Sequence, residues 1–239
     1  MKEALSRAYN FILDILFPIR CISCDKEGEW ICRKCFKKIE IKENQTCPKC
    51  FSRSKDGKYC DKCSVCSKMK GVIITGTYED KLLQKAVHIL KYKYVKDLCK
   101  PLACILNKGF NIWCKNNKVE LKNIILIPVP LHKKKENKRG FNQAKLLAKE
   151  LSLKVNLKVN NKILKRVKNT KAQAKQDSLI RRKNIKGAFA IDQSIDLKNK
   201  IIFIIDDVCT TSSTLEECAK EIDKLNPKEI WGLVLARGR

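Results

Sequence analysis

The residues best suited to do chemistry follow a run of five apolar residues, 201–205. Two adjacent carboxylates, Asp206 and Asp207, come directly after this run, and residues 210–214 then supply five hydroxyl side chains in a row. Such hydroxyls, together with the unpaired N–H groups at the start of a helix, are the donors that a phosphate needs. Adjacent acids are suited to ribose hydroxyls or to a phosphate-bound Mg²⁺. The segment therefore predicts a site for a phosphorylated ligand.

The elements around this segment place it at one edge of a sheet. Residues 201–205 are typical of a strand buried on both faces in a parallel sheet, and residues 215–225 have the pattern of a helix. Open α/β sheets hold their ligands at the carboxyl ends of their strands, where the two acids lie. The alternative is a buried strand followed by helix-capping hydroxyls. Paired acids at a strand end are, however, costly without a ligand or a partner.

The segment resembles the phosphoribosyl pyrophosphate (PRPP) loop of type I phosphoribosyltransferases. The pattern of that loop is two acids, a spacer, Thr-Thr-Gly and a further Thr. Ser212 stands where those proteins usually have Gly, a residue suited to a positive φ or to a close approach of the backbone. The resemblance implies that PRPP is bound by Asp206, Asp207, Val208, Cys209, Thr210, Thr211, Ser212, Ser213 and Thr214.

A second strand and a basic loop predict another anion-binding edge in the same sheet. Residues 123–129, which are apolar from Ile124 onward, have the pattern of a second buried strand, and a basic loop covers residues 131–143. Between residues 131 and 186 there are 19 Lys and Arg against three acids, a balance that favours nucleic acid or phosphate groups as partners. A solvated charge run, or an excess of Lys across the whole chain, is the alternative. Neither explains the segment Arg-Gly-Phe-Asn-Gln at 139–143.

Nine of the 14 Cys lie in residues 21–66, and eight of them form four Cys-x-x-Cys pairs. Each pair can present two thiolates to one metal ion, and two pairs complete a tetrahedral zinc site. Sequential pairing predicts two sites, although interleaved pairs, or Cys66 in place of Cys63, also fit the spacing. Disulfides are the alternative, which a reducing compartment disfavours. The predicted ligands are Cys21, Cys24, Cys32, Cys35, Cys47, Cys50, Cys60 and Cys63.

The remaining segments predict further elements of an α/β domain. Residues 71–78 alternate like a strand, and residues 81–94, 101–113 and 144–151 have helical patterns. His88 is interpreted as a surface or boundary residue, and nothing near Cys209 marks it as a nucleophile. The other four thiols are interpreted as buried: Cys99, Cys104, Cys114 and Cys218.

The chain has no apolar run of membrane-spanning length. Residues 1–17 have a helical period, but Glu3 and Asp14 interrupt it and no small-residue cleavage site follows. We therefore expect a cytoplasmic protein without membrane insertion.

Several motifs occur in the order seen in the ComF family. They are Pro-Val-Pro-Leu-His at 128–132, Arg-Gly-Phe-Asn-Gln-Ala at 139–144, residues 166–170, Gln173, residues 181–184, Gly-Ala-Phe at 187–189, the acid-pair loop and Leu-Ala-Arg-Gly at 235–238. With the cysteine pairs they cover nearly the whole chain, which therefore resembles that family. The resemblance implies an N-terminal helix and double zinc ribbon at 1–70. A type I phosphoribosyltransferase-like α/β domain, with a mainly parallel sheet flanked by helices, would follow at 71–239.

The resemblance also assigns roles to single residues. Asp206 and Asp207 would bind the ribose hydroxyls and, with Arg139 as the principal cation, form the catalytic set. Residues 210–214 would hold the 5′-phosphate. The pyrophosphate loop would comprise Pro130, Arg139, Gly140, Phe141, Asn142 and Gln143. A flexible loop over the site would include Arg166, Thr170, Gln173, Arg181, Arg182 and Asn184.

Three functions are compatible with these features. The first is binding of PRPP with Mg²⁺ and transfer of the phosphoribosyl group to an acceptor. No residue stands out as a general base, which a reaction driven by electrostatics and leaving-group neutralisation tolerates. The second is a non-catalytic accessory of DNA uptake or repair that binds single-stranded DNA, with Phe141 stacking on a base. The third is a zinc-ribbon adaptor for a helicase-type competence protein.

Overall fold

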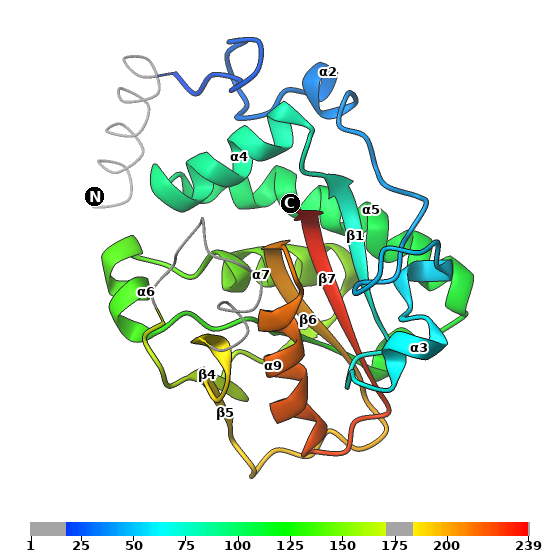
Figure 1. Cartoon of the computed structure of the whole chain (residues 1–239). Coiled ribbons are helices and arrows are strands. Elements are labelled where there is room, and N and C mark those ends of the chain that lie inside the picture. Colours follow the sequence, from blue (N-terminus) through cyan, green and yellow to red (C-terminus); the bar gives the residue numbers. More distant parts are fainter. Residues whose placement is uncertain (1–17, 171–183, 239) are drawn as a thin grey trace.

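A computed structural model of the chain describes residues 18–170 and 184–238. Its centre is a sheet of five parallel strands in the spatial order β1-β7-β6-β2-β3 (Figure 1). The predicted mainly parallel sheet is therefore confirmed, and the strand that carries the acid pair, β6, is the central one. The strands are β1 (Gly71–Thr77), β2 (Ile124–Pro128), β3 (Lys158–Val159), β6 (Ile201–Cys209) and β7 (Glu229–Arg237).

Helices cover both faces of this sheet (Figure 1). α5 (Cys99–Asn117) and α7 (Gln143–Val155) bury their apolar residues against one face. α9 (Ser213–Asp223) packs against the other face. α4 (Lys81–Tyr92) shares the core of the first face and begins at Asp80, whose side chain accepts two backbone N–H groups. Within the described ranges, no helix combines the length and the apolar character that a membrane span requires.

An aromatic cluster holds α5 on the strands that carry the site. Trp113 of α5 meets Phe203 of β6 and Trp231 of β7 at ring-centroid distances of 4.9 and 5.2 Å, both edge-on. Phe203 and Trp231 are register partners on neighbouring strands. Each aromatic pair of this geometry contributes about 0.5–1.5 kcal/mol beyond the burial of its surface. The cluster therefore fixes β6 just before the strand presents its two acids.

The structure differs from the predicted elements beside the site. The predicted basic loop at 131–143 contains a helix, α6 (Lys133–Arg139), which begins at His132 and ends at Gly140 with a φ of 74°. All seven residues of α6 are polar, so it has no apolar period by which a sequence reveals a helix. The smaller elements are α2 (Arg33–Phe36), η1 (Lys55–Gly57), α3 (Asp61–Ser64), η2 (Lys96–Leu98), η3 (Leu121–Asn123), and the antiparallel pair β4 (Leu164–Arg166) and β5 (Phe189–Ile191).

The cysteine-rich segment covers the edge strand β1. Lys58 forms a bridge with Gly71. The buried side chain of Gln45 takes the place of a strand, because its Oε1 accepts the N–H of Ile74 at 3.0 Å and its Nε2 donates to the Ile74 carbonyl at 2.9 Å. An uncovered sheet edge would present unpaired backbone groups to other chains. The segment therefore completes the sheet as well as carrying the cysteine pairs.

Two glycines allow a close approach of backbones at this edge. A Cβ on Gly71 would lie 2.3 Å from the carbonyl oxygen of Gly57. Gly57 itself has a φ of 74°, and its Cβ would lie 2.3 Å from the carbonyl oxygen of Val72. Neither position accepts a side chain without a shift of the backbone. The later part of the cysteine-rich segment is therefore seated directly on β1.

We expect Gly71→Ala to lower the free energy of unfolding by about 1–3 kcal/mol, because the added methyl group overpacks this contact. Urea denaturation measures the change. Lys70→Ala is the matched control, since Lys70 is the preceding residue and its side chain is exposed. It should change the stability by less than about 0.5 kcal/mol. Equal stabilities of the two variants would contradict the close approach.

Candidate functional site

The two acids at the carboxyl end of β6 have different surroundings. Asp207 is buried, and its Oδ1 lies 2.9 Å from the Nζ of Lys91 and accepts the N–H of Val208 at 2.6 Å. Asp206 is only partly buried, and its Oδ1 accepts the N–H of Asp207 at 2.9 Å. The Oδ2 of Asp207 is buried and has no hydrogen-bond partner among the residues described. The pair therefore presents acceptor oxygens that a ligand can use.

Lys91, near the end of α4, is a site residue that the sequence did not indicate. Burial alone would lower its pKa, but the charges of Asp207 and Asp206 outweigh burial and raise it. Lys91 therefore stays charged and neutralises part of the acid pair. Many other lysines of this chain also lie in amphipathic helices near further lysines. The sequence around Lys91 therefore does not distinguish it from them.

Asp206 is the acid whose charge is not fully compensated. Burial, and next the charge of Asp207, raise the pKa of Asp206 to about 7, although Lys91 and Arg166 act in the opposite direction. A group with a shifted pKa beside a specific charge partner is a candidate for a functional role. Binding of a cation or of a hydrogen-bond donor would favour the ionised form.

Three cations form a cluster without a carboxylate ion pair of their own in the described ranges, and one of them, Arg166, acts on Asp206. Lys135 and Arg139 are four residues apart on α6, and Arg166 ends β4. Burial, followed by the charges of Arg166 and Arg139, lowers the pKa of Lys135. Burial also lowers the pKa of Arg166, while the charge of Asp206 acts against it. No ion pair of the described residues involves any of the three, so the cluster has the charge and the spacing to bind an anion.

The five hydroxyl residues, 210–214, which we call the hydroxyl loop, span the turn after β6 and the first two residues of α9. Ser212 is the N-cap of α9, and its side chain makes no capping hydrogen bond. Thr211 Oγ1 and Ser213 Oγ lie 2.6 Å apart and share a hydrogen bond. The first turn of α9 therefore keeps amide groups and the positive end of its dipole for an anion.

Ser212 has the backbone conformation that its place in the loop led us to expect. Its φ is 56° and its ψ is 6°, in the left-handed region. A residue with a side chain pays about 1–2 kcal/mol for this conformation, and Gly pays almost nothing. The loop therefore has the shape that normally calls for Gly, with Ser in its place.

Two predicted members of the pyrophosphate loop have structural roles instead. Phe141 is buried in the core, with the Nζ of Lys96 5.6 Å from its ring centroid, so the prediction that it stacks on a base is wrong. Asn142 caps α7 by accepting the N–H of Ala144 at 2.9 Å, and it donates to the Val129 carbonyl at 3.0 Å. The apolar ring is buried because the chain turns inward between α6 and α7.

The other four members of that loop differ in their surroundings, and Gln143 is buried. Arg139 donates from Nη1 to the Oε1 of Gln143 at 2.5 Å, which fixes the direction of the guanidinium. Pro130 follows β2 and is partly exposed, and Gly140 supplies the positive φ that ends α6. Arg139 is thus the only charged residue of these four, and its charge acts on Lys135 of the cation cluster.

Of the predicted flexible loop, Gln173, Arg181 and Arg182 lie outside the described residues, as does the helix predicted for residues 1–17. Asn184 lies in a described segment. Arg166 donates from Nη2 to Thr170 Oγ1 at 2.5 Å, and its buried Nε has no partner among the residues described. Arg166 is therefore the member of this set that the structure brings to the acids.

The thiols outside the cysteine pairs carry no sign of reactivity. Burial raises the pKa of Cys209 to about 11, so the thiol stays protonated at neutral pH. Cys99 and Cys218 are also buried, as predicted, whereas Cys104 and Cys114 are partly exposed. His88 is exposed, in agreement with its interpretation as a surface residue.

The cysteine pairs assemble into two compact groups. The first consists of Cys21, Cys24, Cys32 and Cys35, and the second of Cys47, Cys50, Cys60 and Cys63, with all four sulfur atoms of each group within 4.8 Å of one another. In each group a backbone N–H donates to a sulfur, from Cys32 to Cys21 at 3.4 Å and from Cys60 to Cys47 at 3.5 Å. Four converging sulfurs with N–H donors fit tetrahedral zinc. Sequential pairing is confirmed, and Cys66 belongs to neither group.

Comparisons with known proteins agree with this division of the chain. A double zinc ribbon domain matches residues 12–64, and a phosphoribosyl transferase domain matches residues 103–239. Competence protein F of Haemophilus influenzae is 33% identical over 238 residues, which cover 92% of this chain and 98% of that protein. DNA utilization protein YhgH of Salmonella typhimurium is 29% identical over 138 residues, 58% of this chain and 60% of that protein.

Among solved structures, a purine phosphoribosyltransferase from Pyrococcus horikoshii is 18% identical. The superposition covers 58% of this chain and 83% of that protein, with a TM-score of 0.35. A likeness of this size carries no argument about activity, which has to come from the residues of the site.

We expect the purified protein to hold two zinc ions per chain, because each group of thiolates completes a tetrahedral site. Cys24→Ser and Cys50→Ser should each remove about one ion, which elemental analysis measures. Cys66→Ser is the matched control and should keep both. Loss of zinc from the Cys66 variant, or none from the Cys50 variant, would contradict the assignment.

Asp206→Asn should raise the free energy of unfolding by much more at pH 8 than at pH 5. At pH 8 the wild-type protein carries a charged Asp206 beside Asp207, and Asn removes that repulsion. At pH 5 Asp206 is protonated in the folded protein, where its pKa is about 7, but already ionised in the unfolded chain. The gain at pH 5 is therefore smaller than at pH 8. Wild-type stability is thus lost as the pH rises from about 4, the unfolded value, to about 7.

Urea denaturation at both pH values measures this difference. Glu43→Gln, which removes an exposed acid, is the control and should have no effect at either pH. A gain in stability of equal size at pH 5 and pH 8 would show that Asp206 is already ionised at the lower pH.

Proposed function

Because the chain belongs to the ComF family, with a double zinc ribbon and a phosphoribosyltransferase domain, we propose that it binds PRPP together with Mg²⁺. The observation that carries the proposal is an acid pair together with a cluster of three cations that form no ion pair among the described residues, one of which, Arg166, acts on Asp206. PRPP has ribose hydroxyls between two anionic ends. It therefore needs acceptors in the middle of its site and positive groups at both ends.

The described residues match these needs one by one. Asp206 and Asp207 would accept the ribose hydroxyls or hold the Mg²⁺ that accompanies the pyrophosphate. The hydroxyl loop would bind the 5′-phosphate through its hydroxyl groups and the amide groups of α9. Lys135, Arg139 and Arg166 would take the pyrophosphate. In the ligand-free protein, the ion pair with Lys91 compensates the negative charge of Asp207.

We further propose that the bound PRPP transfers its phosphoribosyl group to an acceptor. The bond from C1 of the ribose to the pyrophosphate oxygen breaks, and C1 forms a bond to the acceptor. Positive charge develops on the sugar and negative charge on the leaving group. Arg139 and Arg166 would stabilise the leaving group, and the nearby acids would stabilise the sugar, so electrostatics supplies most of the catalysis.

Binding of single-stranded DNA is the second candidate, which exposed groups beside the site favour. Lys133, Lys134 and Lys138 of α6 are exposed, and the ring of Tyr92 is 61% exposed with the Arg139 guanidinium 6.0 Å from its centroid. Lysines that follow a phosphate backbone and a ring that stacks on bases are the usual parts of such a surface. The names of the relatives, which refer to competence and DNA utilization, agree with this candidate. The adaptor role for a helicase stays a prediction.

Calorimetric titration with PRPP and Mg²⁺ tests the proposed function. We expect Arg139→Met to weaken binding at least tenfold, equivalent to about 1.4 kcal/mol, because it removes a cation from the pyrophosphate. The double replacement of Asp206 and Asp207 by Asn should weaken binding by a similar factor. Lys138→Met is the matched control, since Lys138 is the adjacent residue of α6 and is exposed, and it should leave the affinity unchanged.

Equal affinities of wild type and the Arg139 variant would reject the assignment of the cations. Absence of binding by wild type, with binding by Ser212→Gly, would locate the fault in the hydroxyl loop. A single-stranded oligonucleotide that binds at low salt and is not displaced by PRPP would separate the DNA surface from this site.

A further inference from the structure

One arginine at the end of β7 reaches the hydroxyl loop. Arg237 pairs in register with Cys209, the last residue of β6. Its Nε donates to the carbonyl oxygen of Thr210 at 3.2 Å, and its Nη2 lies 3.4 Å from the hydroxyl oxygen of Ser212. Arg237 thus contacts the loop at Thr210, its first residue, and at Ser212, the residue with the left-handed backbone. The shape of the loop therefore depends on where this guanidinium is held.

The same guanidinium is held by the turn of the second zinc group. Its Nη2 donates to the carbonyl oxygen of Pro48, and its Cζ lies 4.5 Å from the ring centroid of Phe51. Pro48 lies between the ligands Cys47 and Cys50, and the N–H of Phe51 donates to the Cys47 carbonyl at 3.1 Å. A turn of this shape is the one that presents two thiolates to one metal. The Pro48 carbonyl thus meets Arg237 only while the turn keeps that shape.

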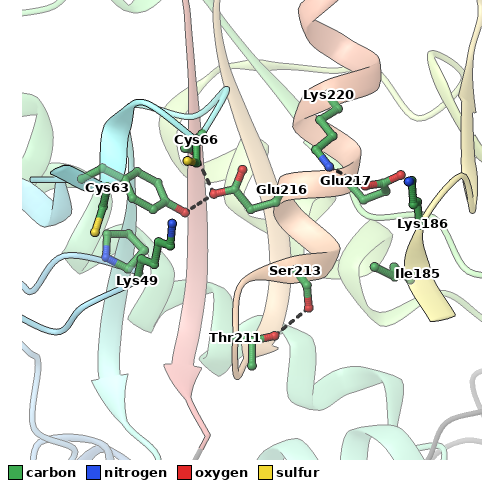
Figure 2. Close-up of a pocket in the computed structure, with 13 residues that line it drawn as sticks. Lys49, Cys63, Cys66, Ile185, Lys186, Thr211, Ser213, Glu216, Glu217 and Lys220 are labelled. Carbon is green, nitrogen blue, oxygen red and sulfur yellow. Dashed lines mark hydrogen bonds and ion pairs between the residues drawn. The ribbon is translucent and has the colours of Figure 1, made fainter. Parts of the chain in front are cut away.

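Glu216 of α9 makes a second link between the same two parts (Figure 2). Its Oε1 accepts hydrogen bonds from the hydroxyl of Tyr59 and from Ser67 Oγ, the latter at 2.8 Å. Tyr59 is buried and precedes Cys60, a member of the second group. The second zinc group is therefore tied to the helix that begins at the loop as well as to the loop itself.

A pocket of about 380 Å³ separates the ribbon from the loop between these links. Thr211 and Ser213 line it from the loop, and Lys49 and Cys66 line it from the ribbon (Figure 2). Buried residues of the second zinc group, among them Cys47 and Tyr59, also share an apolar core with Cys209 and Leu215 on either side of the loop. The contacts of Arg237 are the ones that reach Thr210 and Ser212 of the loop itself.

The first zinc group is attached to another part of the molecule. Cys21 and Ile22 share a core with Leu83 and Leu90 of α4. Lys85 of α4 also donates to the Ile22 carbonyl at 2.5 Å. The two groups have the same set of ligands but different neighbours. Loss of metal from the first group therefore serves as a control for loss of metal from the second.

We propose that Arg237 is a positioning residue that transmits the shape of the second zinc group to the hydroxyl loop. The loop then keeps its left-handed Ser212 only while Cys47, Cys50, Cys60 and Cys63 hold their metal. Strained backbone of this kind persists where the surroundings determine it strongly, and Arg237 and Glu216 supply those surroundings. The order of the loop does not depend on which ligand it binds, whereas any effect on PRPP affinity rests on the function proposed above.

Hydrogen–deuterium exchange of the ligand-free protein tests this proposal. Four proteins are compared: wild type, Cys50→Ser, Cys24→Ser and Arg237→Met, each with its zinc content measured. Amides of residues 210–215 should exchange at least about tenfold faster in the Cys50 and Arg237 variants, because local opening becomes easier. The Cys24 variant should exchange like wild type there. Residues 201–205 should be unchanged in the Arg237 variant, which should keep both zinc ions.

Wild-type exchange of the loop in Arg237→Met would overturn the proposal, and so would equal acceleration in the Cys24 and Cys50 variants. If Cys50→Ser does not fold, the Arg237 variant with its zinc intact decides the outcome. A merely structural role of Arg237 would accelerate residues 201–205 together with the loop. If wild type fails to bind PRPP while exchange follows the expectation, the proposed function fails and the positioning role stands.

Discussion

The ion pair between Lys91 and Asp207 is the interaction on which the rest of the site depends. Two adjacent carboxylates at the end of a buried strand repel each other and lose hydration, so they need a cation nearby. Lys91 supplies it from α4, at 2.9 Å, and this contact brings the end of the helix to the carboxyl edge of the sheet. Asp206 has no such ion pair among the described residues, and its pKa is about 7. A bound cation or hydrogen-bond donor would therefore favour its ionised form.

Several features of this edge are unfavourable in the ligand-free protein. Ser212 adopts a left-handed backbone, and three cations lie near one another without an acid partner. Each of them costs stability, and a ligand with negative charge would offset the repulsion among the cations. Natural proteins depart from the rules of stable folding mainly at functional sites, where binding compensates the cost. The concentration of these departures at one edge supports a binding site there independently of the family.

The cysteine-rich segment is stabilised in a different way from the sheet. It has little apolar surface, and converging sulfur atoms take the place of a core of its own. Through Gln45 and the Gly57–Gly71 contact it also covers the edge of β1. The two zinc groups are attached to different partners, the first to α4 and the second to β7 and α9. Both attachments lead to the carboxyl edge of the sheet, so the ribbon supports the site from two directions.

Short-range patterns in the sequence were enough to predict the parallel sheet, the strand that ends in Asp206 and Asp207, and the four cysteine pairs. These features depend on residues a few positions apart, whose spacing reflects the period of a strand or the geometry of a metal turn. The tertiary structure alone decided that the pairs combine sequentially, that Phe141 is buried, and that Lys91 and Arg237 serve the site. α6 also escaped prediction, because an all-polar helix has no apolar period. Contacts between residues far apart in the sequence leave no local pattern, since only folding brings their side chains within bonding distance.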